Sequence, residues 1–306
     1  MSLPTGVRAD YPLARLTTIR AGGRADLFAR PEDEAGLVRL LGWAAAEGVE
    51  VGIVGSGSNL LISDRGFRGL VLKLDGELSA IERVDSRVVC GGGARLPSAA
   101  ARAARWGLGG LEFGINIPGS VGGAVKMNAN AYGGELARVL EWVDVCTSEG
   151  VGRRAPSELG FAYRRSNLGP GEIVSRASFQ LAEGDPGEIK GTLAEMRGMR
   201  REAQPSGIKT FGSTFKNPVD DAGAEGRTAG QLLDAAGCRG LQVGGARLSE
   251  VHANFVENVG GATTADILEL MAEARRRVHQ HFGVTLEAEV QVLGEVEWPE
   301  AWRLDG

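Results

Sequence analysis

A strand-like run leads directly into a glycine- and serine-rich loop in VGIVGSGSNLLISD, residues 51–64. Val51 to Val54 is a short apolar run typical of a buried strand, and Gly55-Ser56-Gly57-Ser58-Asn59 follows it directly. Backbone N–H groups, two hydroxyls and an amide in such a loop can surround phosphate oxygens without a lysine. On this stretch alone, a plain glycine-serine turn remains the alternative.

The loop matches neither of the two commonest nucleotide-binding motifs. A Rossmann fingerprint needs a third glycine and a helix, whereas Leu60-Leu61-Ile62 predicts more strand. A Walker A loop needs a lysine after a glycine, and this pair occurs nowhere in the chain. Both motifs are therefore excluded.

A second glycine-rich stretch is GINIPGSVGGAVKMNANAYGGE, residues 114–135. Pro118-Gly119-Ser120 and Gly122-Gly123 can bring bare backbone close to another group, and the aliphatic residues between them predict a buried loop rather than a linker. Two buried glycine-rich loops indicate a nucleotide-containing cofactor between two subdomains, with structural turns as the alternative. Polar side chains that could contribute there are Asn128, Asn130 and Tyr132.

Composition narrows the class of protein. The chain has 306 residues, of which 43% are hydrophobic and 24% charged, as in a globular protein of two or three domains. Its net charge of −5 gives no basic surface for nucleic acid or anionic lipid. Three scattered cysteines, Cys90, Cys146 and Cys238, favour a reducing compartment and no metal site. Without a signal peptide or a membrane-length apolar run, we expect a cytoplasmic, soluble protein.

Periodicity predicts an α+β chain of several small units rather than one doubly wound sheet. The candidate inter-domain link is AQPSG, residues 203–207. Helices are expected at 31–48, 97–106, from 185 to before Pro205, and 263–281. Strands are expected at 51–54, 69–74, 140–147, 173–181 and 285–293, and a β-rich run at 81–90.

Two stretches carry charged side chains suited to chemistry. GFAYRRSNL, residues 160–168, contains Arg164, and a planar guanidinium can pair with a carboxylate or a developing enolate. The alternative is that its adjacent arginines lie on an exposed surface. LEAEVQVLGE, residues 286–295, places Glu287 and Glu289 on one strand face, which is commonly exposed. If Glu289 is buried beside a ligand, its pKa should rise and it could act as an acid.

A third stretch, FGSTFKNP at residues 211–218, places Ser213 in a cramped, glycine-led turn. A serine nucleophile needs a base, but His252, His279 and His281 have no triad or metal-ligand spacing. Ser213 also lies outside any G-x-S-x-G elbow. A serine hydrolase is therefore excluded, and His252 is expected to be structural.

Taken in order, GSGSNLL, IPGSVGGAVKMNANAYGGE, FAYRRS, GSTFKNP and LEAEV resemble the UDP-N-acetylenolpyruvoylglucosamine reductase family, also called UDP-N-acetylmuramate dehydrogenases. The resemblance runs from about Thr17 to Glu295, and it is the order and spacing of five motifs that make it specific. The short link before Ser213 resembles the shorter class of the family, which lacks the tyrosine loop. The chain departs from the family pattern at Thr17, Asn130 and Gln231.

The resemblance implies an α+β architecture in three parts. Residues 1–76 and 77–203 would form the two subdomains of an FAD-binding fold of the vanillyl-alcohol-oxidase-like type. Residues 204–306 would form a C-terminal α+β substrate-binding domain, whose last strand returns to the active site. We expect a monomer or weak oligomer, with no nucleic-acid or membrane partner.

The resemblance also implies the reaction. NADPH reduces bound FAD, which then reduces the double bond of UDP-N-acetylglucosamine enolpyruvate to give UDP-N-acetylmuramate for peptidoglycan synthesis. Arg164 would stabilise the enolate, Glu289 would assist in its protonated form, and Ser213 would give the α carbon its proton. Substrate contacts are implied for Tyr163, Lys216 and Asn217. FAD contacts are implied for Gly55, Ser56, Gly57, Ser58, Asn59, Leu60, Gly119, Ser120, Gly122 and Gly123.

Two alternatives stay open at this point. One is a flavin-dependent oxidase of an alcohol or sugar on the same fold, which would consume oxygen. The other is a nucleotide-sugar binding module without enzymatic activity, which would hold no flavin. The serine-lysine-asparagine motif and the late glutamate argue against both.

Overall fold

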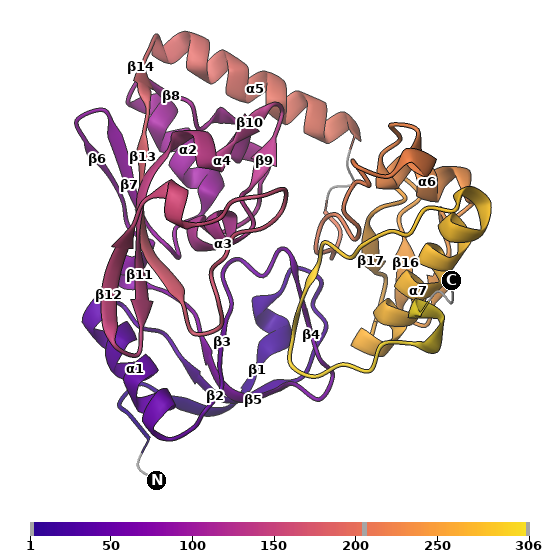
Figure 1. Ribbon diagram of the computed structural model, residues 1–306, viewed down its shortest axis with the longest axis horizontal. Helices are drawn as coiled ribbons and strands as arrows, with labels where there is room; N and C mark the ends of the chain where they lie inside the picture. The colour runs from indigo at the N-terminus through magenta and orange to yellow at the C-terminus, as the bar shows by residue number, and fades with distance from the viewer. Residues whose placement is uncertain (1–2, 204–206, 304–306) are drawn as a thin grey trace. The chain divides into compact units, whose positions relative to one another are not determined.

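The computed structural model describes residues 3–203 and 207–303, which form two compact units (Figure 1). The first unit comprises Met1–Asp10, Asp26–Ser56 and Gly69–Glu202, and the second comprises Tyr11–Ala25, Gly57–Arg68 and Ala203–Gly306. The core of the link predicted at 203–207 is residues 204–206, which lie outside the described residues. The three-domain division drawn from the sequence stays a prediction.

The first unit contains a five-stranded antiparallel sheet with strand order β12-β11-β13-β7-β6. Most of its other elements are helices and short hairpins around this sheet (Figure 1). Its elements are β3 (Val51–Ile53), β6 (Ile81–Val84), β7 (Arg87–Gly91), β8 (Leu108–Gly109), β9 (Asn130–Ala131), β10 (Gly134–Glu135), β11 (Leu140–Thr147), β12 (Gly150–Arg154), β13 (Ile173–Gln180), β14 (Ala182–Glu183), α1 (Glu34–Ala46), α2 (Leu96–Arg105), α3 (Val121–Lys126), α4 (Leu136–Val139) and α5 (Pro186–Ala203).

Helices cover both faces of this sheet. Val143 and Val145 of β11 belong to the core cluster that contains the alanines of α2 and α3. Cys146, which follows Val145 and points to the opposite face, belongs to the cluster that contains the apolar stripe of α1. Strand β11 is therefore buried on both faces, with the bounds expected from the sequence.

Three strands run through both units: β1 (Arg8–Pro12), β2 (Arg24–Ala29) and β5 (Phe67–Leu72). They form a second sheet of order β1-β2-β5-β3, in which β3 pairs with β5 in parallel. Helix α1 precedes β3 and buries the predicted face, Leu37 to Ala44. It begins at Glu34 rather than near Pro31, because the Asp33 carboxylate accepts the N–H of Gly36 at 2.5 Å and so caps the helix.

The second unit is organised around the helix α7 (Thr264–Phe282), whose buried stripe includes Ile267, Leu270 and Met271 as predicted. Thr263 and Asp266 form the expected capping box at its start. A further cap was not expected: the Asp64 carboxylate accepts the N–H groups of Thr264 at 2.9 Å and Ala265 at 3.0 Å. The other elements are α6 (Ala229–Ala235), β4 (Leu60–Ile62), β15 (Gln242–Val243), β16 (Ala246–Leu248), β17 (Val256–Asn258) and β18 (Gln291–Leu293).

The β-rich run at 81–90 forms a hairpin of β6 and β7, with Asp85 at φ +54° in the turn. Two other sequence expectations need correction. The loop expected at 114–135 contains the helix α3. The strand expected at 285–293 is reduced to β18, which pairs with β4 in parallel, because residues 285–290 have no continuous strand partner. Within the described part of the chain, every helix is too short or too polar to span a bilayer.

Candidate functional site

In the first unit, the two glycine-rich stretches meet at Gly55 and Ser120. A Cβ on Gly55 would lie 2.2 Å from Oγ of Ser120, so a side chain has no room there. Lys73, just after β5, donates from Nζ to the carbonyl oxygen of Gly55 at 2.5 Å. Burial, reinforced by Arg30 and Arg95, lowers the pKa of Lys73. The first loop is therefore held in place by the second loop and by a partly desolvated cation.

The second stretch uses its glycines in different ways. The N–H groups of Val121 and Gly122 donate to Ala94 and Gly92, and the N–H of Gly123 donates to Oγ of Ser120. Within residues 3–203 and 207–303, the N–H groups of Gly119 and Ser120 donate to no protein acceptor. A Cβ on Gly119 would have no heavy atom nearer than Cγ2 of Ile117, at 3.9 Å. Protein packing alone gives no reason for glycine at this position.

In the second unit, Gly57 and the residues after it are fixed by backbone contacts. Gly57 has φ +65°, and a Cβ on it would lie 2.0 Å from the carbonyl oxygen of Leu16. Its own carbonyl accepts both N–H and Oγ1–H of Thr18, at 2.9 and 3.1 Å. Thr17 is buried and bonds Ala14 through its hydroxyl, so the departure from the family pattern at this position is accommodated locally.

Asn59 lies at the end of the first glycine-rich loop and bonds to the stretch 286–295, which contains Glu289. Its Nδ2 donates to the carbonyl oxygen of Glu289 at 3.2 Å, while its Oδ1 is buried without a hydrogen-bond partner. A buried amide oxygen of this kind needs a donor. Each of these features fits a bound nucleotide cofactor such as FAD. The unbonded N–H groups of Gly119 and Ser120 can donate hydrogen bonds to it, and the open face of Gly119 leaves room for it. The Asn59 oxygen can accept a hydrogen bond from it.

Arg164 lies at the corner of a tight turn in the first unit. Ala162 and Arg165 exchange both backbone hydrogen bonds, at 3.0 and 3.1 Å, with Tyr163 and Arg164 between them. Arg164 has φ +55°, a conformation that costs a non-glycine residue free energy and often marks a functional side chain. Its guanidinium donates to the carbonyl oxygen of Asn130 at 3.2 Å and lies 5.3 Å from the ring of the exposed Tyr163.

Ser213 and Glu289 are brought together in the second unit. Ser213 forms a bridge with Phe255, and the next residue, Thr214, donates its N–H to Asn254 O at 2.8 Å. The carbonyl of Thr214 accepts the N–H of Glu289, also at 2.8 Å. Ser213 and Glu289 are both half-buried, and the Ser213 hydroxyl makes no hydrogen bond within the described residues. Segment 213–216 thus lies between segments 254–255 and 287–289.

The two expected substrate-binding neighbours of Ser213 have protein partners. Lys216 pairs with Glu287 at 3.1 Å, and Glu287 is largely exposed. An exposed ion pair of this kind contributes little to stability, so Lys216 can exchange Glu287 for a ligand at small cost. Oδ1 of Asn217 accepts the N–H of Ala229 at 3.0 Å, at the start of α6.

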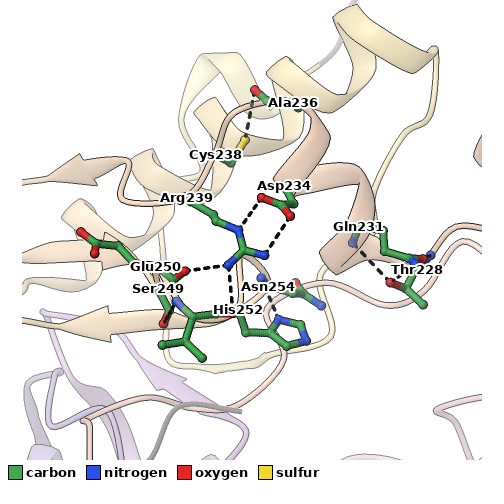
Figure 2. Close-up of polar contacts among 11 residues, drawn as sticks. Thr228, Gln231, Asp234, Ala236, Cys238, Arg239, Ser249, Glu250, His252 and Asn254 are labelled. Atoms are coloured by element: carbon green, nitrogen blue, oxygen red, sulfur yellow. Dashed lines mark hydrogen bonds and ion pairs between the residues drawn. The ribbon is translucent and has the colours of Figure 1, made fainter. Parts of the chain in front are cut away.

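A polar cluster beyond this segment was not foreseen (Figure 2). Arg239 pairs with Asp234 of α6 and donates to the carbonyl oxygens of Glu250 and Val251 at 2.7 and 3.1 Å. The Nδ1 atom of His252 accepts the N–H of Asn254 at 3.3 Å. Burial, with Arg239 nearby, lowers the pKa of His252, which suits the neutral structural histidine that we expected. The sequence signal for this cluster was Asn254, a polar residue within an apolar run.

Residues 3–203 and 207–303 contain no group of three or more His, Cys, Asp or Glu side chains placed to bind a metal ion.

Comparison with known proteins identifies the family. Residues 25–155 match the FAD binding domain model, and residues 204–293 match the C-terminal domain model of UDP-N-acetylenolpyruvoylglucosamine reductase. The UDP-N-acetylenolpyruvoylglucosamine reductase 2 of Symbiobacterium thermophilum is 44% identical over 297 residues, covering 96% of this chain and 94% of that protein. The corresponding enzyme of an Anaeromyxobacter species is 44% identical over 289 residues, covering 94% and 89%.

A solved structure agrees with these matches. The crystal structure of UDP-N-acetylenolpyruvylglucosamine reductase from Thermus caldophilus has a TM-score of 0.80 and 39% identity, covering 94% of this chain and 99% of that one. The chain is therefore an FAD-dependent oxidoreductase with an FAD-binding domain and a separate C-terminal domain of the reductase type. It belongs to the UDP-N-acetylenolpyruvoylglucosamine reductase family. The family, fold class and cofactor inferred from the sequence are confirmed.

Proposed function

We propose that this chain reduces the enolpyruvyl double bond of UDP-N-acetylglucosamine enolpyruvate with NADPH, giving UDP-N-acetylmuramate for peptidoglycan synthesis in the cytoplasm. Membership of the family supports the reaction. The observation that carries the assignment of residues is the hydrogen bond from the Glu289 N–H to the carbonyl of Thr214, the residue that follows Ser213. We also keep the expectation of a monomer or weak oligomer.

When bound, FAD would supply hydride chemistry, with NADPH as the hydride source and the β carbon of the double bond as the acceptor. The loop residues we assign to its diphosphate are Gly55 to Leu60 together with Gly119, Ser120, Gly122 and Gly123. Among these, Gly119 and Ser120 have the stronger support, since the N–H groups of Val121, Gly122 and Gly123 are already bonded within the protein.

The chain's own side chains then handle charge and one proton. As the β carbon gains hydride, negative charge spreads from the α carbon into the attached carboxylate. The guanidinium of Arg164 stabilises that enolate, held in position by its turn and by Asn130. Glu289 assists in its protonated form.

The Ser213 hydroxyl gives its proton to the α carbon, which completes the reduction. A hydroxyl suffices because a carbanionic carbon is a strong base, so no histidine is needed. The hydroxyl is available for this role, because it makes no hydrogen bond within the described part of the second unit. Tyr163, Lys216 and Asn217 contact the substrate, with Lys216 exchanging its exposed carboxylate partner for the substrate.

The test separates the two half-reactions by anaerobic stopped-flow absorbance. Ser213→Ala should leave reduction of the flavin by NADPH unchanged. It should slow oxidation of the reduced flavin by the enolpyruvyl substrate by about 10²-fold or more, which is the usual contribution of a general acid. Thr214→Val is the matched control, because the buried Thr214 hydroxyl has no hydrogen-bond partner and its loss should affect neither rate. Equal damage to both half-reactions in Ser213→Ala would overturn the proton-donor role.

A further inference from the structure

The side chain of Asn254 bonds the backbone of the segment that carries Ser213. Its Oδ1 accepts the N–H of Phe215 at 2.9 Å, and its Nδ2 donates to the carbonyl oxygen of the same residue, also at 2.9 Å. The Asn254 amide thus satisfies both the N–H and the carbonyl oxygen of Phe215, as a neighbouring β-strand would do. Because a donor faces a carbonyl and an acceptor faces an N–H, only this orientation of the amide fits.

The main chain of Asn254 adds a third contact to the same segment. Its carbonyl accepts the N–H of Thr214 at 2.8 Å. Asn254 is 4% exposed, Thr214 0% and Phe215 1%, so water cannot replace these bonds. Losing one partner of a buried hydrogen bond leaves the other group unsatisfied, which is why buried amides of this kind hold a backbone firmly.

The residues just before Asn254 are themselves held by hydrogen bonds. The carbonyls of Glu250 and Val251, just before it, accept hydrogen bonds from Arg239, which is fixed by Asp234 of α6 (Figure 2). The ring of His252 accepts the N–H of Asn254 and packs edge-on against Phe255, with centroids 4.8 Å apart. A chain of contacts therefore runs from α6 through Asn254 to the residues beside Ser213.

We propose that Asn254 is a positioning residue for the reduction, because its side chain fixes Phe215 and Thr214 and thereby places the Ser213 hydroxyl. The inference rests on the proposed function, in which Ser213 donates the proton. A general acid is effective only within hydrogen-bond reach of the atom it protonates, so a small shift of segment 213–215 is costly. Nothing in this role requires Asn254 to touch substrate or cofactor.

The experiment uses the FAD-loaded full chain and the variant Asn254→Ser, with Asn258→Ser as its matched control. The Asn258 side chain hydrogen-bonds Ile19, Gly260 and Ala262 in the same unit and, among the described residues, makes no hydrogen bond to segment 213–216. In Asn254→Ser, oxidation of the reduced flavin by the enolpyruvyl substrate should be about 10- to 100-fold slower, and reduction of the flavin by NADPH should be unchanged. This loss is part of the rate that a general acid contributes. Asn258→Ser should leave both half-reactions near wild type.

A double-mutant cycle separates positioning from a general structural effect. In a Ser213→Ala background, Asn254→Ser should cost about 3-fold or less, because the group it positions is gone. If the two losses multiply, Asn254 does not act through Ser213 and the inference is wrong. If Ser213→Ala alone is harmless, the proposed function fails first, and the two failures are thus distinguishable.

A second readout does not depend on activity. Hydrogen exchange measured by mass spectrometry should be faster at the amides of Thr214 and Phe215 in Asn254→Ser, and unchanged there in Asn258→Ser. Unchanged exchange at both amides in Asn254→Ser would also overturn the inference. If Asn254→Ser does not fold, Asn254→Gln carries the same test, since it keeps the amide but displaces it by one methylene.

Discussion

The glycine at position 119 allows the cofactor site to be tested apart from the chemistry. Its φ lies outside the left-handed region, and a Cβ would have nothing within 3.9 Å. Gly119→Ala is therefore sterically free in the protein alone, where a glycine-to-alanine change at a compatible site stabilises by about 0.4–1 kcal/mol through the unfolded chain. If the FAD diphosphate lies against this backbone, the added methyl group instead meets the ligand.

The size of the effect follows from overpacking. Forcing a methyl group into a close contact costs about 1–3 kcal/mol, which corresponds to about a 5- to 150-fold weaker Kd. The apoprotein is titrated with FAD while flavin fluorescence is followed, and its free energy of unfolding is measured in urea. We expect weaker FAD binding by Gly119→Ala together with an apoprotein at least as stable as wild type.

Two other glycines serve as references for this result. A methyl group added to Gly152, on the exposed strand β12, would have nothing within 4 Å, so Gly152→Ala should leave FAD affinity unchanged and the apoprotein at least as stable as wild type. Gly55→Ala should lower apoprotein stability, because its Cβ would lie 2.2 Å from Oγ of Ser120. A Gly119→Ala protein that binds FAD as tightly as wild type would refute the assignment of this loop.

Three further predictions concern single side chains. Asp64→Ala should lower the free energy of unfolding by about 0.5–2 kcal/mol, because both N–H groups that Asp64 caps at the start of α7 lose their acceptor; chemical denaturation measures this, and a change near zero contradicts the cap. Arg164→Lys keeps the charge but loses the planar fork, so oxidation by substrate should slow by about 10²-fold; wild-type rates would make Arg164 structural. The pKa of His252 is lowered in the folded state, so the unfolded chain binds more protons below about pH 6.5 and the free energy of unfolding falls as pH drops. His252→Gln should weaken this pH dependence of the free energy of unfolding. If the pH dependence is unchanged in His252→Gln, His252 is not its source.

Local signals were sufficient to predict the elements whose partners are close in sequence. The capping box of Thr263 and Asp266 sets the start of α7, and the strand-like run at 140–147 coincides with β11. Helix α1 begins at Glu34, after the N-cap Asp33, rather than near Pro31, because the Asp33 carboxylate satisfies the backbone N–H of Gly36.

Long-range contacts explain what the sequence could not predict. Glu289 was expected within a continuous strand, but its neighbours are Asn59 and Thr214, which lie 230 and 75 residues away in the chain. Ser120 caps α3 in a stretch whose glycines predict a loop, and that serine was the available signal for a helix. The contacts of Asn254 with Phe215 span 39 residues, and no local periodicity indicates them.

The visible absorption spectrum of the purified protein under anaerobic conditions decides whether this chain is the proposed reductase. We expect an oxidised flavin spectrum that bleaches with NADPH and returns on adding UDP-N-acetylglucosamine enolpyruvate, but not on adding UDP-N-acetylmuramate. The proposed function is contradicted if an alcohol or sugar reduces the flavin and oxygen reoxidises it, while the enolpyruvyl substrate does not.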